Sequence, residues 1–143
     1  MKYIDGGVTA AKGFKASGIH CGIRKNQTKK DLAMIVSDTK CSAAAVYTQN
    51  KVYGAPITVT RNNIADGYAQ AVICNSGIAN TCNADGIEKA NAMCNLVEQV
   101  SGIAASDVVV ASTGVIGQVL DITPIANGMQ ALTDGLSYEG SEQ

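Results

Sequence analysis

Residues 85–117 read DGIEKANAMCNLVEQVSGIAASDVVVASTGVIG and decide the fold, because they predict an amphipathic helix followed by a buried strand. Between Asp85 and about residue 101 apolar side chains recur at helical spacing, and Gly102 supplies the stop. The β-branched run 108–110 that follows is typical of a buried strand. An apolar helix face next to such a strand favours a helix packed on a sheet. That face consists of Ile87, Ala90, Met93, Cys94, Val97 and Val100.

The remaining segments extend this pattern in both directions. Alternating or short apolar runs predict strands at 14–23, 32–37 and 43–48, arranged as an antiparallel meander, and further strands at 57–60 and 70–75. A second helix is predicted from Thr123 or Pro124 to about Leu132, since proline suits the first helical turn. We therefore expect one domain over residues 1–143 with an α/β (α+β) fold, in which two helices pack on one face of a mixed sheet.

The composition sets the character of the core. The chain has 143 residues, of which 46% are hydrophobic and only 4% aromatic, with one Phe and no Trp. A domain of this length buries ~70% of the surface that its unfolded chain exposes, so it needs neither a metal nor a disulfide to hold a core. We expect a core of Ala, Val and Ile side chains.

The charge balance excludes several classes of partner. Eleven basic residues against twelve acidic ones give a net charge of -1, which argues against a nucleic-acid-binding module. The densest basic group, made of Arg24, Lys25, Lys29 and Lys30, is predicted to be a solvated loop. The first residues lack the apolar core of a signal peptide, and no stretch approaches the ~18 apolar residues of a membrane span. We expect a cytoplasmic, soluble protein.

The cysteines do not predict a metal centre or a disulfide framework. They are five in number, no two form a Cys-x-x-Cys pair, and the chain has a single histidine. Buried, reduced thiols are the ordinary interpretation. A cysteine nucleophile would need His20 as its base, and the sequence does not place the two together.

Two unusual loops follow apolar strands. Residues 75–81, NSGIANT, could bring amide groups close to a ligand, or could form only a turn and a helix cap. Ser112-Thr113-Gly114 could direct backbone N–H groups and a hydroxyl at an anionic oxygen, as an oxyanion hole requires, or could be a plain turn. The common Walker, dinucleotide-binding, zinc-protease and serine-hydrolase motifs are absent from the sequence.

Taken together, these segments resemble the ornithine acetyltransferases, also called glutamate N-acetyltransferases, of the cyclic route to arginine. The resemblance implies a self-processing acyltransferase-like fold and a precursor that cuts itself before a threonine into an α and a β chain. It also implies ping-pong transfer of acetyl from N-acetylornithine to glutamate through that N-terminal threonine. The matching stretches are 6–9, 12–14, 31–35 with 37–38, 55–56, 75–77 with 79–80, and 111–117.

The resemblance also implies roles and partners. Thr113 would contribute its hydroxyl and Gly114 its backbone N–H to the oxyanion hole, whereas the nucleophile and the substrate-binding residues would lie outside this chain. The partner would be the β chain, in an α2β2 assembly, with N-acetylornithine and glutamate as substrates and no cofactor or metal. A bifunctional enzyme would also accept acetyl-coenzyme A.

Two departures limit this comparison. The family has Asn where this chain has Ile78, and the chain contains no Ala-Thr dipeptide at which the precursor could be cut. We therefore expect an N-terminal portion of the α chain that is inactive by itself. The alternatives are a catalytically silent interaction module and a related self-cleaving aminopeptidase.

Overall fold

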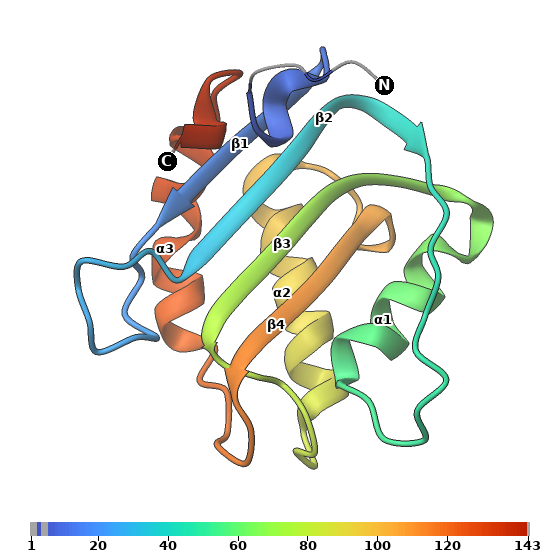
Figure 1. Cartoon of the computed structure of the whole chain (residues 1–143), viewed down its shortest axis with the longest axis vertical. Helices are drawn as coiled ribbons and strands as arrows, with labels where there is room; N and C mark the ends of the chain where they lie inside the picture. Colours follow the sequence, from blue (N-terminus) through green and yellow to red (C-terminus); the bar gives the residue numbers. More distant parts are fainter. Residues whose placement is uncertain (1–2, 4–5, 143) are drawn as a thin grey trace.

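Four strands form one mixed sheet in the computed structural model, which describes Tyr3 and residues 6–142. The strands are β1 (Phe14–Ile19), β2 (Leu32–Ser42), β3 (Tyr68–Ile78) and β4 (Val108–Val115), and they lie in that order across the sheet (Figure 1). The pairs β1–β2 and β2–β3 are antiparallel, whereas β3 and β4 are parallel. The predicted mixed sheet is confirmed.

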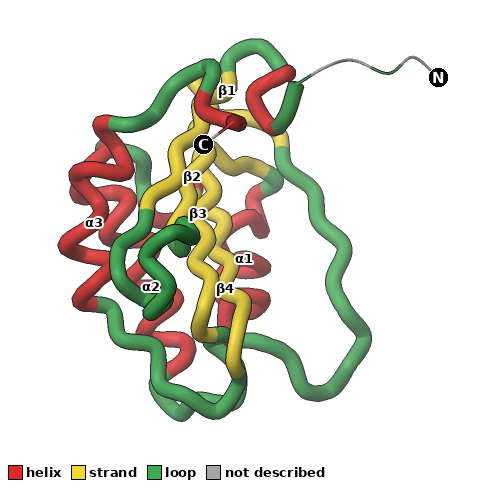
Figure 2. The backbone as a smooth tube through the Cα atoms, turned by 60° about the vertical axis from the view of Figure 1, so that its left-hand side comes forward, coloured by secondary structure: helices red, strands yellow, loops and turns green. Residues whose placement is uncertain are grey.

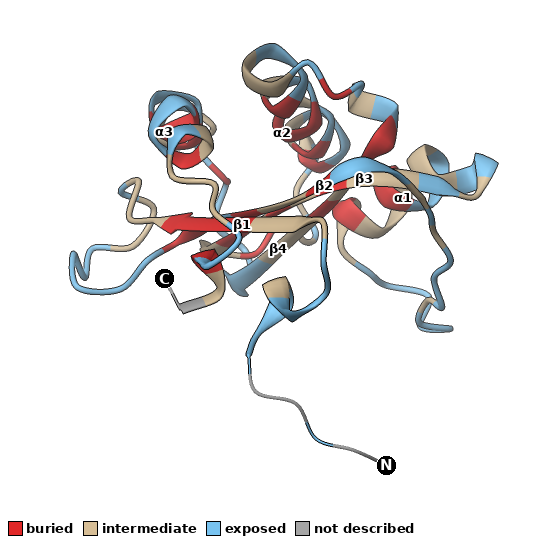
Figure 3. Cartoon of the chain, turned by 90° about the horizontal axis from the view of Figure 1, so that it is seen from above, coloured by how far each residue is buried: buried red, intermediate tan, exposed pale blue. Residues whose placement is uncertain are grey.

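Two long helices cover one face of this sheet. Figure 3 shows α2 (Gly86–Ser101) and α3 (Thr123–Asp134) side by side above the strands. Their ends follow the local signals, because Gly102 closes α2 in the left-handed conformation and a proline occupies the first turn of α3. Both helices were predicted from the sequence. The short 3-10 turns η1 (Val8–Ala10) and η4 (Gly140–Glu142) lie against β1.

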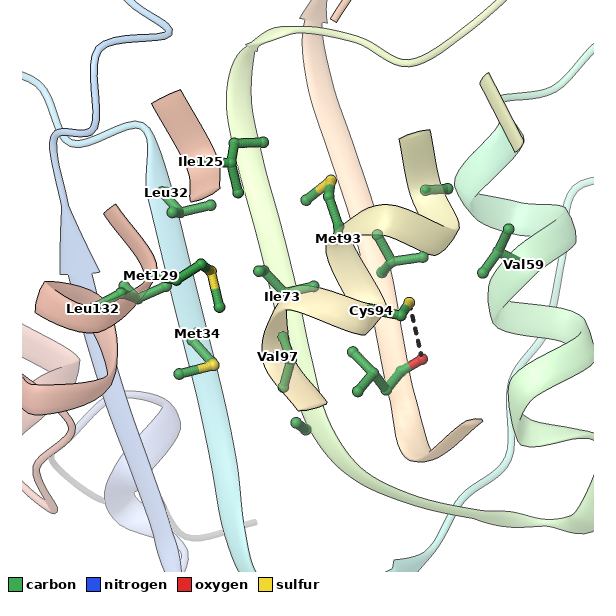
Figure 4. Close-up of a cluster of buried hydrophobic side chains, with 14 of the residues drawn as sticks. Leu32, Met34, Val59, Ile73, Met93, Cys94, Val97, Ile125, Met129 and Leu132 are labelled. Carbon is green, nitrogen blue, oxygen red and sulfur yellow. Dashed lines mark hydrogen bonds between the residues drawn. The ribbon is translucent and has the colours of Figure 1, made fainter. Parts of the chain in front are cut away.

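The core lies between the sheet and these two helices (Figure 4). Strand side chains that alternate toward the helices meet the apolar stripes of α2 and α3. The prediction of an Ala, Val and Ile core is incomplete, because leucine and methionine supply many of the largest buried side chains. The flexible methionines fill the irregular space between helix and sheet. The fully buried side chains include Leu32, Met34, Ile73, Met93, Val97, Leu120, Ile125, Met129 and Leu132.

Residues 57–60 form part of a helix, so the predicted strand there is wrong. Helix α1 (Ala55–Asn63) has a proline in its first turn and buries Pro56, Val59 and Thr60 at helical spacing. The Thr60 hydroxyl donates to the carbonyl of Val110 at 3.0 Å and accepts from the N–H of Val110 at 3.1 Å. The helix therefore covers the edge of β4 and satisfies backbone groups there. The local preference of these residues for a strand does not include such a tertiary contact.

Residues 43–48 form no strand either. They belong to a long loop that leaves the sheet after β2 and returns at α1 (Figure 2). Val46 is 99% exposed, so the apolar side chain at the centre of this run has no surface to pack against. The third strand of the antiparallel meander is instead β3, which pairs with β2 from Leu32↔Asn75 to Ser42↔Tyr68.

Candidate functional site

The two unusual segments singled out in the sequence lie side by side at the ends of β3 and β4. The parallel register pairs Asn75 with Ser112, Ser76 with Thr113 and Gly77 with Gly114. Both segments were predicted to be loops that follow strands, but the strands continue through them to Ile78 and Val115. The carboxyl ends of two parallel strands thus bring Thr113 and Gly114 next to Ser76 and Gly77.

The missing side chain of Gly114 allows a close approach to the paired Gly77. Gly77 has φ +112° and Gly114 has φ +132°, backbone conformations that residues other than glycine rarely adopt. A Cβ atom on Gly114 would overlap the carbonyl carbon and oxygen of Gly77 and would lie 2.7 Å from the nitrogen of Ile78. The backbone at Thr113–Gly114 is therefore held directly against the backbone of β3.

The exposed side chain of Thr113 lies on the face of the sheet that α2 and α3 do not cover. Its neighbour Ser112 points the other way, since its Oγ lies 4.0 Å from the sulfur of Met93 in α2. Val110 directs its backbone groups away from β3 toward Thr60, and the alternation of a strand places the N–H of Gly114 on the same outer edge. A hydroxyl and an N–H are thus both presented to solvent at this corner.

Buried asparagines hold the neighbouring segment in place. The Asn75 side-chain amide donates to the carbonyl of Ile78 at 3.0 Å, and the Asn80 amide donates to the carbonyl of Gly86 at 2.7 Å. Both side chains are almost fully buried, so neither is available to a ligand in solvent. The predicted turn and helix cap is wrong as well, since residues 75–78 are the end of β3 and α2 begins without a side-chain cap hydrogen bond. Ile78 is half-buried and packs against the core, so it does not disturb the strand.

Arg24 contacts this site although the sequence analysis assigned it to a solvated loop. Its Nε donates to the Ser76 hydroxyl at 3.0 Å, and the side chain is half-buried. No local pattern signals a bond between residues 52 positions apart. The other members of that basic group, Lys25, Lys29 and Lys30, are exposed as predicted.

Asp31 organises the turn that carries Arg24. Its carboxylate accepts the N–H of Cys21 at 2.7 Å and that of Arg24 at 2.8 Å. Burial of the carboxyl raises its pKa, but the hydrogen bonds from the N–H groups of Arg24 and Cys21 outweigh this, so the net pKa lies below the ordinary 3.8. Asp31 is therefore a buried, ionised group that fixes residues 20–24.

The same environment argues against Cys21 as a nucleophile. Burial and the adjacent Asp31 raise the pKa of the Cys21 thiol to about 12, so it is not a thiolate at neutral pH. His20 directs its Nδ1 at Asp31, 3.2 Å away, and at the carbonyl of Lys29. Burial likewise raises the pKa of Cys94 to about 11. Within the part of the chain that the structure describes, no group of three or more His, Cys, Asp or Glu side chains could hold a metal ion.

A cavity of about 270 Å³ adjoins the outer edge of β4. It lies between the loop before α1, the first turns of α1 and residues 109–112 of β4. Tyr47, Thr60, Thr81 and Ser112 are among the residues that line it, together with apolar ones. Over the described residues, no helix is long and apolar enough to cross a membrane.

Comparisons with known proteins agree with one another. The ArgJ family model matches residues 15–143. Proteins called arginine biosynthesis bifunctional protein ArgJ include one from Halalkalibacterium halodurans, 44% identical over 99% of this chain and 34% of its own length. Another, from Gloeobacter violaceus, is 46% identical over 99% of this chain and 35% of its own length. The chain thus spans about a third of the length of these relatives.

Solved structures show the same fold. The ArgJ protein of Bacillus halodurans superposes with a TM-score of 0.87 at 44% identity, over 95% of this chain and 71% of that one. The ornithine acetyltransferase of Mycobacterium tuberculosis, solved with ornithine, gives a TM-score of 0.87 at 31% identity, over 94% of this chain and 74% of that one. Since the family match extends over residues 15–143, this chain belongs to the ArgJ family.

Proposed function

We propose that this chain is part of a glutamate N-acetyltransferase of arginine biosynthesis, which moves acetyl from N-acetylornithine to glutamate. Relatives above 40% identity are named as bifunctional arginine biosynthesis proteins, and a structural neighbour is an ornithine acetyltransferase solved with ornithine. Because the chain spans about a third of the curated relatives, the reaction is assigned to the complete protein. We propose that this protein acts in the cytoplasm.

The contribution of this chain to catalysis is an oxyanion hole. The observation that carries the assignment is the Gly77–Gly114 approach, which fixes Thr113 and Gly114 at the exposed end of two strands. When a nucleophile adds to the acetyl carbonyl, negative charge develops on its oxygen, and the Thr113 hydroxyl and the Gly114 N–H would stabilise it. The hole costs no reorganisation during the reaction, because the β3 backbone already holds it in place.

The nucleophile in this proposal is the N-terminal threonine of a β chain, released when the precursor cuts itself. The threonine oxygen attacks the acetyl carbon of N-acetylornithine, and its own α-amino group takes the proton. Ornithine leaves with that proton on its nitrogen, and an acetyl-threonine ester remains. The amine of glutamate then attacks the ester, which yields N-acetylglutamate and restores the threonine. This route needs no metal or cofactor, and a bifunctional enzyme would accept acetyl-coenzyme A as a second acetyl donor.

The β chain would also cover the free face of the sheet. Ile35, Val72 and Val109 form a row across β2, β3 and β4 on the side opposite α2 and α3, and all three are only half-buried. A row of apolar side chains at that exposure fits an interface between chains. We propose an α2β2 assembly that contains this contact, and we expect the chain of 143 residues to be inactive by itself because an oxyanion hole cannot attack a carbonyl carbon.

The experiment that tests the proposal compares two activities of the full-length protein. Acetyl transfer from N-acetylornithine to glutamate is measured beside hydrolysis of short peptides, the reaction of a self-cleaving aminopeptidase. Acetyl transfer without peptide hydrolysis supports the proposal. Peptide hydrolysis alone would assign the protein to the aminopeptidase class. If both activities are absent, the interaction-module alternative is supported.

A further inference from the structure

We propose that Arg24 is a positioning residue for acetyl transfer: it braces the Ser76–Gly77 end of β3, against which the Thr113–Gly114 oxyanion hole rests. The inference depends on the proposed function for its kinetic consequence. Its structural part, the control of the β4 end by Arg24, stands on the contacts alone.

The first step is the anchoring of the turn that presents Arg24. Asp31 is 2% exposed and accepts the N–H groups of both Cys21 and Arg24 through its two carboxylate oxygens. The backbone of Asp31 accepts the N–H of Ser76 at 2.8 Å. One residue therefore ties the 20–24 turn and the end of β3 together, and the turn cannot shift relative to the strand without breaking charge-assisted hydrogen bonds.

The second step is the contact between Arg24 and β3. The Nε of Arg24 donates to the Ser76 hydroxyl at 3.0 Å. Its Cγ and the Cγ2 of Ile23 lie 3.0 and 3.1 Å from the position that a Cβ atom of Gly77 would occupy. Among the described residues, no carboxylate lies within salt-bridge distance of the guanidinium, so the observed polar partner of this side chain is Ser76. Arg24 thus presses on Gly77 and holds Ser76 at the same time.

The third step carries the constraint to the hole. Thr113 and Gly114 are paired with Ser76 and Gly77 on one side. The contacts of α1 to the outer edge of β4 involve Val108 and Val110, earlier in the strand. The position of the hole is therefore set by the end of β3, which Arg24 holds. Misplacement of a catalytic group by about 1 Å can cost on the order of 10²-fold in rate.

The kinetic test uses the full-length protein with two variants that remove the same bond. Arg24→Met keeps an aliphatic stem against Gly77 but removes the Nε donor, and Ser76→Ala removes the acceptor. We expect each to lower kcat for acetyl transfer by roughly 10- to 100-fold with KM and the thermal midpoint unchanged. The double variant should be no slower than either single variant, since both remove one interaction. Lys25→Met, an exposed neighbour, is the matched control and should leave kcat unchanged.

A second measurement separates this inference from the proposed function. Amide hydrogen exchange at residues 113 and 115, whose N–H groups face β3, should become faster in Arg24→Met, while exchange in α2 stays the same. A wild-type protein without acetyl transfer would overturn the proposed function, yet faster exchange in the variant would still support the brace. Unchanged exchange at residues 113 and 115 overturns the positioning role. A higher KM for glutamate with unchanged kcat would also overturn it, because Arg24 would then bind the substrate carboxylate.

Discussion

Gly77 and Gly114 are paired across the parallel β3–β4 ladder, and the backbone at Gly77 leaves no room for a side chain on Gly114. Both have positive φ, and the Cβ position of Gly114 coincides with the peptide that follows Gly77. We expect Gly114→Ala to lower the free energy of unfolding by about 2–5 kcal/mol, since a strained backbone and an overlap of main-chain atoms add together.

Gly117→Ala is the matched control for that substitution. Gly117 also has positive φ, +87°, but nothing lies within 4 Å of its Cβ position. Gly117→Ala should lower the free energy of unfolding by only about 1–2 kcal/mol, which is the contribution of the strained backbone alone. Urea unfolding of both variants measures the difference, and equal losses would show that the close approach to Gly77 has no energetic weight.

Thr113→Ala should separate catalysis from stability. The side chain is exposed and its hydroxyl stands at the corner of the sheet, so its removal should change the free energy of unfolding by less than about 0.5 kcal/mol. If the hydroxyl stabilises the oxyanion, kcat for acetyl transfer in the full-length protein falls by about 10²- to 10³-fold. Steady-state kinetics with N-acetylornithine and glutamate provide the readout. A wild-type rate would show that Thr113 is not an oxyanion donor.

The buried hydroxyl of Thr60 should stabilise the domain. Thr60→Val leaves the N–H and the carbonyl of Val110 without the partner seen at 3.1 and 3.0 Å, at an expected cost of about 1–3 kcal/mol. Thr60→Ser keeps the hydroxyl and loses one methyl group, which should lower the free energy of unfolding by about 1 kcal/mol. Denaturant unfolding distinguishes the two. The interpretation fails if the serine variant is the less stable one.

The carboxylate of Asp31 should make stability depend on pH. Its pKa is lower in the folded protein than the ordinary 3.8, so its stabilising effect is complete above that value and is lost as pH falls through the folded-state pKa. We expect Asp31→Asn to be less stable than the wild type by about 1.5–3 kcal/mol near pH 7. This difference in stability between the wild type and the variant should become smaller below about pH 4. Urea unfolding at a series of pH values tests this, and a gap that does not change with pH would contradict it.

Local signals in the sequence located the two long helices and missed the third. Helix α2 follows from its apolar periodicity and from Gly102, and α3 follows from its proline. Helix α1 contains Ile57, Val59 and other β-branched residues that favour a strand. Its first turn holds a proline, as that of α3 does, and the contacts of Thr60 and Asn63 with β4 add to this local signal. A tertiary contact of that kind has no local pattern.

The residues of the candidate site could likewise be predicted from local signals, but their contacts could not. In the sequence, Ser112-Thr113-Gly114 and the 75–81 segment are separate features, because the whole of α2 lies between them. Only the pairing of β3 with β4 brings them together. Arg24 belongs to a basic group of the sequence, and such a group predicts a solvated loop. Its bond to Ser76 depends on the turn folded by Asp31, which only the assembled sheet creates.

The contact between α1 and β4 also covers one edge of the sheet against pairing with other molecules. An unpaired strand edge can template a strand from another molecule, which is the first step of amyloid-like growth. Thr60 and Asn63 occupy the outward backbone groups of Val110 and Val108, and the positive φ of Gly114 interrupts the flat edge beyond them. A fibril that grew through β4 would first have to detach α1, so loosening this one helix should favour aggregation through that edge.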